Sequence, residues 1–152
     1  MKKNNAGFTI IELLVVIAII AVLAAIVLIN VTRYIDKGKD SAAMGDLGTL
    51  FTNAITFYNE TGAFEGVTTD PDYQKVVAGL ESDKMNYKVS EDNLVSTCNV
   101  SADCTDPADS EWCVAINLKT TDDASYCVDS SGNKKEYSGT AATAACSAGA
   151  CQ

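Results

Sequence analysis

Six cysteine side chains could form covalent bonds, and all of them follow the apolar stretch of residues 8–29. They are Cys98, Cys104, Cys113, Cys127, Cys146 and Cys151. An even number of cysteines within one region is typical of disulfides, which form in exported proteins in an oxidising compartment. No two of them have C-x-x-C spacing and the chain contains no histidine, which disfavours a metal site. We therefore predict disulfides, with free thiols and bound metal as alternatives.

The other residues offer little catalytic chemistry. Without histidine the chain lacks the commonest general base, and it has no G-x-S-x-G, phosphate-binding loop or H-E-x-x-H motif. Two acidic loops do not follow the EF-hand calcium pattern, and we interpret them as solvated surface. They contain Asp103, Asp106 and Asp109, and Asp122 with Asp123. The sequence predicts no enzyme activity, no cofactor and no metal.

One carboxylate, that of Glu12, lies within the apolar stretch. From Leu13 to Ile29 no residue carries a polar side chain. A helix rises about 1.5 Å per residue, so the run that starts at Phe8 is long enough to cross a hydrocarbon core of about 30 Å. An unpaired carboxylate in lipid costs several kcal/mol, so we expect Glu12 to have a partner.

The segment before the apolar run, Met1–Gly7, contains Lys2 and Lys3, which hold this end in the cytoplasm. A secretory signal has its small-residue cleavage site after the apolar core, whereas here the small residues precede it. A cut at the end of this leader would keep the apolar run and expose the ammonium of Phe8. That ammonium, four residues from Glu12, could be the missing partner.

Residues 7–13, Gly-Phe-Thr-Ile-Ile-Glu-Leu, and the run after them resemble the N-terminus of type IV pilins and of type II secretion pseudopilins. The resemblance implies cleavage after Gly7 by a prepilin peptidase and N-methylation of Phe8. It also implies that Glu12 neutralises the N-terminal amine of a neighbouring subunit during assembly. A plain signal anchor is the alternative.

The resemblance weakens further along the chain. Many relatives carry a helix-kinking proline where this chain has Ile29. Residues 57–64 resemble an aromatic-rich helix exit that seats the helix end against the domain. Major pseudopilins bind calcium in a loop near their sheet, so calcium is the alternative for the acidic loops.

After the apolar run the pattern becomes that of an amphipathic helix. Its apolar stripe is Ala43, Leu47, Leu50, Phe51, Ala54, Phe57 and Tyr58, and its polar face is Asp36, Lys37, Lys39, Asp40, Asp46, Asn53 and Glu60. We predict one helix from about Phe8 to about Glu60, roughly 80 Å long, with Gly62 as a left-handed cap. Gly38, Gly45 and Gly48 weaken it, and indicate either close packing or flexibility, or a site of bending.

The remaining residues predict a small antiparallel sheet. Asp70 and Pro71 open a short helix over residues 72–78, which Gly79 stops. Strands are predicted from Met85 by the alternation of residues 85–90, and then at residues 94–95, 112–118, 125–129 and 134–138. The tail from Gly139 is predicted as loop. The fold class is α+β, with the long helix packed on the sheet.

Folding the predicted hairpin about residue 120 places Cys113 opposite Cys127, so we predict a disulfide between them. By elimination, Cys98–Cys104 and Cys146–Cys151 are then local loop closures.

The formal net charge is −9, and removing the leader leaves 9 basic and 20 acidic side chains, a net charge of −11. This balance disfavours DNA binding through the bulk surface. Arg33, Lys37 and Lys39 cluster beside the apolar run, where lipid head groups are the expected contacts.

We expect a cleaved leader (1–7), a membrane-spanning and filament-core half-helix (8–30), an amphipathic half-helix (31–62) and a globular disulfide domain (63–152). The leading hypothesis is a type IV pilin, a homo-oligomeric filament subunit serving adhesion, motility or DNA uptake. A secretion pseudopilin and a non-assembling anchored binding domain are the alternatives. The expected partners are a prepilin peptidase, an inner-membrane assembly platform and lipid. The expected locations are the cytoplasmic membrane in a single pass, then an extracellular pilus.

Overall fold

The computed structural model describes residues 7–82, 85, 87, 94–98, 104, 106, 108–121 and 124–152. The chain divides into two compact units, Met1–Asp36 and Lys37–Gln152. The fold is α+β, with a long N-terminal helix and a small antiparallel sheet. The strand predicted from Met85 lies mostly outside the described residues, as do Asp103 and the pair Asp122 and Asp123.

The long helix, α1, runs from Ile10 to Thr61. At its end Gly62 has φ +85°, and its N–H donates to the carbonyl of Tyr58 at 2.8 Å. The left-handed cap predicted at Gly62 is therefore confirmed.

The predicted apolar stripe is buried in the second unit. Ala43, Leu47, Leu50 and Ala54 are fully buried in the main core, and Phe51, Phe57 and Tyr58 pack against it in part. The glycines of this helix, unlike the apolar stripe, are not closely packed. A Cβ added at Gly38, Gly45 or Gly48 would meet nothing within 4 Å. The close-packing interpretation of these glycines is therefore wrong within the chain itself.

The second helix, α2, spans Pro71–Glu81. The Asp70 side chain accepts the N–H groups of Asp72 and Tyr73 at 3.0 and 3.1 Å, which confirms the predicted cap. The prediction that Gly79 stops the helix is wrong. Leu80 is fully buried and its carbonyl accepts the N–H of Tyr87 at 2.9 Å, and these contacts favour another helical turn. A short 3-10 helix, η1 (Val67–Thr69), forms in the loop before α2.

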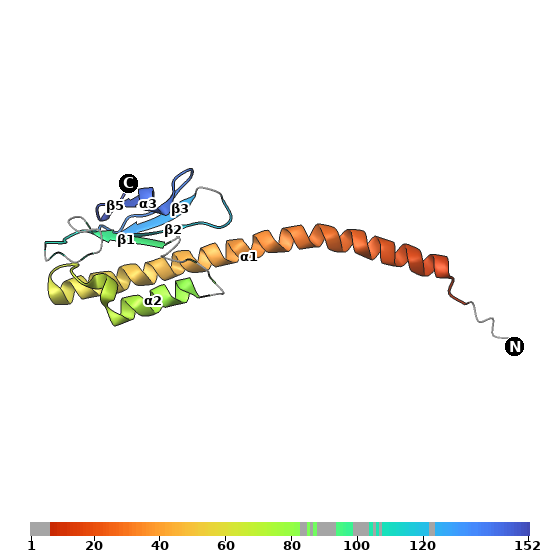
Figure 1. Ribbon diagram of the computed structural model, residues 1–152, viewed down its shortest axis with the longest axis horizontal. Coiled ribbons are helices and arrows are strands. Elements are labelled where there is room, and N and C mark those ends of the chain that lie inside the picture. Colours follow the sequence, from red (N-terminus) through yellow and green to blue (C-terminus); the bar gives the residue numbers. More distant parts are fainter. Residues whose placement is uncertain are drawn as a thin grey trace. The chain divides into compact units, whose positions relative to one another are not determined.

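Four strands form an antiparallel sheet in the order β1-β2-β3-β4. They are β1 (Leu94–Cys98), β2 (Trp112–Asn117), β3 (Ser125–Asp129) and β4 (Lys134–Tyr137). In the second unit, the C-terminal half of α1 and α2 lie side by side against one face of the sheet (Figure 1). The other face carries the C-terminal elements, so this unit has three layers.

The C-terminal tail is not loop throughout. It forms α3 (Ala142–Ala145), β5 (Cys146–Ser147) and β6 (Ala150–Cys151). Ala142 and Ala145 are fully buried against a patch of small sheet residues that includes Ala115. The loop prediction is wrong because small side chains on both surfaces let the backbones approach closely.

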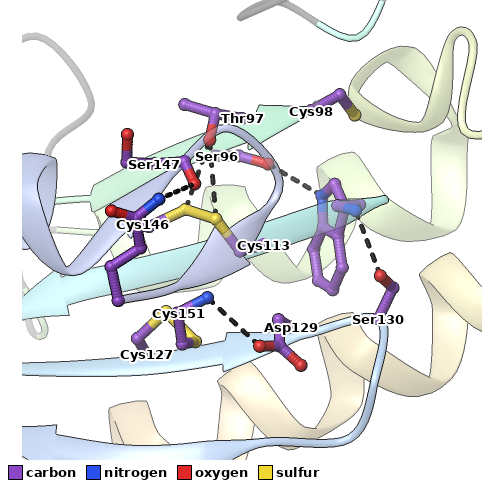
Figure 2. Close-up of a disulfide and its surroundings, with 12 residues drawn as sticks. Ser96, Thr97, Cys98, Cys113, Cys127, Asp129, Ser130, Cys146, Ser147 and Cys151 are labelled. Atoms are coloured by element: carbon purple, nitrogen blue, oxygen red, sulfur yellow. Dashed lines mark hydrogen bonds between the residues drawn. A yellow bond between two sulfur atoms is a disulfide. The ribbon is translucent and has the colours of Figure 1, made fainter. Parts of the chain in front are cut away.

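The structure contains three disulfides: Cys98–Cys104, Cys113–Cys146 and Cys127–Cys151. The first bridge is as predicted, whereas the predicted Cys113–Cys127 and Cys146–Cys151 bridges are wrong. The hairpin register places Cys113 opposite Asp129 and Cys127 opposite Ala115, so the two cysteines are diagonal neighbours. Diagonal Cβ atoms lie about 7 Å apart, too far for a disulfide, and the C-terminal segment supplies both partners instead (Figure 2).

An aromatic cluster joins the end of α1 to the sheet. The rings of Tyr58 and Phe64 lie 4.8 Å apart, and those of Phe64 and Trp112 lie 6.3 Å apart. Both the Trp112 indole N–H and the Tyr73 hydroxyl donate to Ser96 Oγ at 2.9 Å. Burial raises the pKa of Tyr73 to about 12. The aromatic exit thus seats the helix end, as the resemblance implied.

Two acidic residues predicted at the surface are buried. Asp109 is fully buried and accepts the N–H of Asp106 at 3.1 Å, so the solvated interpretation is wrong for this residue. Asp40, assigned to the polar face of α1, is only 3% exposed. A local pattern cannot show such burial, because the groups that surround these carboxylates come from distant segments.

The Asp40 carboxylate ties α1 to the loop after β2. It accepts the N–H groups of Lys119 and Thr120 at 2.9 and 3.0 Å and the Thr120 hydroxyl at 2.6 Å. The hydroxyl of Tyr87 also donates to it. Burial alone raises the pKa of Asp40, but these hydrogen bonds outweigh burial and hold the pKa below its ordinary value.

Two glycine substitutions should have opposite effects on stability. Gly45→Ala adds a methyl group to open space in a helix and should raise the free energy of unfolding by up to about 1 kcal/mol. Gly62→Ala places a Cβ at positive φ and should lower it by about 1–2 kcal/mol. Thermal unfolding of the full chain in detergent, followed by circular dichroism, checks both. Effects of the same sign would contradict this account of the helix.

Asp40→Asn should destabilise the second unit by about 2–3 kcal/mol, because the amide presents donors to groups that already donate. The matched control is Glu60→Gln, an exposed carboxylate on the same helix. The signal is the near-ultraviolet circular dichroism of buried Trp112 during unfolding. Equal stability of the two variants would rule out this role.

The lowered pKa of Asp40 also predicts a pH dependence. A carboxyl with a lowered folded-state pKa contributes stability above its ordinary pKa of about 4. That contribution is lost as pH falls through the lowered value. As pH falls below about 4, the free energy of unfolding should therefore decrease less steeply in Asp40→Asn than in the unsubstituted chain. Parallel curves for the two proteins would contradict the assignment.

Candidate processing and assembly site

The start of α1 is held by a reciprocal pair of polar side chains. Glu12 accepts the backbone N–H of Thr9 at 2.8 Å and the Thr9 hydroxyl at 2.7 Å. In return, the Glu12 N–H donates to Thr9 Oγ1 at 3.3 Å. This T-x-x-E arrangement is a capping box, which satisfies donors that the first helical turn leaves free. It also explains why α1 begins at Ile10 rather than at Phe8.

The capping box gives Glu12 polar partners within its own chain. The partner predicted for Glu12 was the Phe8 ammonium, whereas the structure pairs Glu12 with Thr9. The spacing of Thr9 and Glu12 was the signal that could have revealed the pair. A carboxylate that accepts two hydrogen bonds is less costly to hold near lipid than an unpaired one.

The surface around this cap is apolar and exposed. All described large apolar side chains between Phe8 and Ile35 are at least 45% exposed. Among the described helices, α1 alone is long and apolar enough to cross a membrane, by length and composition. Its most apolar 18-residue window has a mean hydropathy of 3.3, and none of it is buried.

In the part of the chain that the structure describes, the residues predicted to flank the cleavage site are not packed against a core. A Cβ added at Gly7 would meet nothing within 4 Å, and Phe8 is 72% exposed. The structure brings Thr9 and Glu12 together but places neither Gly7 nor Phe8 against a core. The rest of the leader, residues 1–6, lies outside the described residues.

The described residues include one group of candidate metal ligands, Cys113, Cys127 and Cys146. All three form disulfides, so their sulfurs are not available as thiolate ligands.

Residues 2–28 match the family described as the prokaryotic N-terminal methylation motif. The chain is 32% identical over 89 residues to the type IV major pilin protein PilA of Myxococcus xanthus (strain DK1622). The aligned segment covers 59% of this chain and 39% of the relative. It is 42% identical over 52 residues to the type IV major fimbrial protein FimA of Dichelobacter nodosus, which covers 34% of this chain and 33% of the relative.

The motif and these relatives support the type IV pilin family for this chain. The chain spans 39% of the first relative's length and 33% of the second's. No solved structure matches the chain.

Proposed function

We propose that the mature chain is a structural, non-enzymatic subunit of a type IV pilus. A prepilin peptidase cuts after Gly7, Phe8 is methylated, and α1 anchors the subunit in the cytoplasmic membrane until an assembly platform moves it into an extracellular filament. The observation that carries the proposal is the Thr9–Glu12 cap at the start of an exposed apolar helix, within the N-terminal methylation motif.

The exposed face of α1 supports a change of apolar environment. Burying one Leu or Ile side chain away from water is worth about 1.5–3 kcal/mol, so this surface has to be covered. Lipid tails and neighbouring helices are similarly apolar, so transfer from membrane to filament gains little from hydrophobicity. Packing and polar pairs must therefore decide between the two states.

Glu12 is the polar group whose pairing differs between the membrane-bound and the filament states. Before assembly, Thr9 is its hydrogen-bond partner among the described residues. In the filament it also pairs with the ammonium of Phe8 of an adjacent subunit. A subunit shifted along the axis would leave a charge buried and unpaired, so the pair sets the axial register.

The open space at Gly7 supports processing at this position. Among the described residues, no contact and no positive φ requires glycine there, which is consistent with a small residue recognised by another protein. The peptidase that cuts the leader is the protein to which we assign this recognition.

Glu12→Ala should reduce incorporation into filaments by more than tenfold. The Phe8 ammonium would then be buried without a counter-charge, at a cost of several kcal/mol. The amount of this chain in filaments sheared from cells, relative to the membrane fraction, is the measurement. Glu60→Ala, which removes an exposed carboxylate later on the same helix, is the matched control. Unchanged incorporation of Glu12→Ala would show that the register argument is wrong.

Intact mass spectrometry of sheared filaments tests the proposal as a whole. The expected main component begins at methylated Phe8 and is lighter by the six hydrogens that three disulfides remove. The same processed chain confined to the membrane fraction would indicate a secretion pseudopilin instead. A chain that still begins at Met1 in every fraction would exclude both kinds of filament subunit.

A further inference from the structure

Two of the three disulfides lie side by side on the sheet face that carries the C-terminal segment (Figure 2). The Sγ atoms of Cys113, Cys127 and Cys146 all lie within 4.8 Å of one another. Cys113 and Cys146 are bonded to each other. Cys127 Sγ therefore lies near both sulfurs of a bridge to which it does not belong. A thiolate at Cys127 would therefore have a disulfide within reach.

The four cysteines differ in exposure. Cys113, Cys127 and Cys146 are at most 1% exposed, whereas Cys151 is only partly buried. The backbone N–H of Cys151 donates to the Asp129 carboxylate at 3.1 Å, and this hydrogen bond fixes the position of Cys151 beside β3. Exchange rates depend on access to the attacked sulfur, and Cys151 is the most exposed residue of these two bridges.

We propose that Cys151 is the site at which a small thiol attacks this protein, and that the attack starts disulfide exchange inside the domain. The thiolate bonds to Cys151 Sγ, the Cys127–Cys151 bond breaks, and Cys127 leaves as a thiolate. Cys127 then bonds to Cys146 Sγ, the Cys113–Cys146 bond breaks, and Cys113 leaves as a thiolate. The second step is an exchange without net oxidation or reduction.

The register of the sheet selects Cys146 as the sulfur that is attacked. Cys113 and Cys127 are diagonal on adjacent strands and cannot bridge without backbone movement, whereas Cys146 lies on the separate β5. The C-terminal segment thus moves its anchor from β2 to β3 and stays covalently attached, while Cys151 carries the added thiol.

Thr97 is placed to assist the departure of Cys113. Its Oγ1 lies 3.5 Å from both Cys113 Sγ and Cys146 Sγ (Figure 2). Both sulfurs lack a proton, so the hydroxyl is the donor. A hydrogen bond to a leaving thiolate stabilises it.

Reduced glutathione on the full chain in detergent, at about pH 8.5 where thiols ionise, tests the site of attack. Acid quenching, alkylation and peptide mapping then locate the adduct and the free thiol. We expect glutathione on Cys151 and alkyl label on both Cys127 and Cys113. Cleavage at Lys119 places these two cysteines in different peptides. A first adduct on any other cysteine would overturn the proposal.

Cys151→Ser tests the exchange step without added thiol. It leaves Cys127 as the free thiol, and we expect alkyl label to be shared between Cys127 and Cys113. The matched control is Cys98→Ser, which frees Cys104 in the main core on the other sheet face and should leave label on Cys104 alone. Label confined to Cys127 in Cys151→Ser, or spread over all cysteines in Cys98→Ser, would overturn the proposal.

Adding Thr97→Val to Cys151→Ser removes the hydroxyl and keeps the shape of the side chain. The share of label on Cys113 should fall by about fivefold, the ratio that one hydrogen bond of about 1 kcal/mol represents. An unchanged share would remove Thr97 from the mechanism. Circular dichroism of each variant, compared with the unsubstituted chain, verifies that the domain is folded.

Discussion

The burial of one stripe of α1 is the constraint on which the second unit depends. Leu47 and Leu50 are fully buried where the sheet and α2 cover the helix, whereas the described large apolar side chains before Asp36 are exposed. One continuous helix therefore serves two environments. Asp40 marks the start of the covered part, because its carboxylate binds backbone N–H groups of the loop after β2 and fixes that loop to one turn of α1. The sheet is thus positioned by packing along the stripe and by a polar tie at one end.

Features that depend on residues close in sequence could be predicted. The extent of α1, its Gly62 cap, the Asp70 cap of α2 and strand β3 follow from periodicity and from the chemistry of single positions. The short-range bridge Cys98–Cys104 belongs to the same group. In the candidate site, the apolar run and Glu12 were evident, and the Thr9 cap was present in the spacing although it was overlooked.

Features that depend on distant segments could not be predicted in the same way. The pairing of Cys113 depends on the hairpin register. Moving the centre of the turn by one residue changes the residue opposite Cys113 by two, from Cys127 to Asp129, so Cys113 and Cys127 become diagonal neighbours. The burial of Asp40 depends on a loop 79 residues away. The Ala-rich tail has no apolar periodicity of its own, and it folds because the sheet face beneath it is also built from small residues.

The disulfides also decide how the second unit responds to mechanical tension. A pull between α1 and the C-terminus passes across the Cys113–Cys146 bond, so residues 114–145 lie outside the load-bearing path. Most of β2 and all of β3 and β4 are in that shielded segment. Each residue in this segment would add about 3.3–3.6 Å to the length of a fully extended chain, and the bridge prevents that extension. The domain can therefore lengthen only through the chain between α1 and β2 and the last few residues, while the centre of the sheet carries no tensile load.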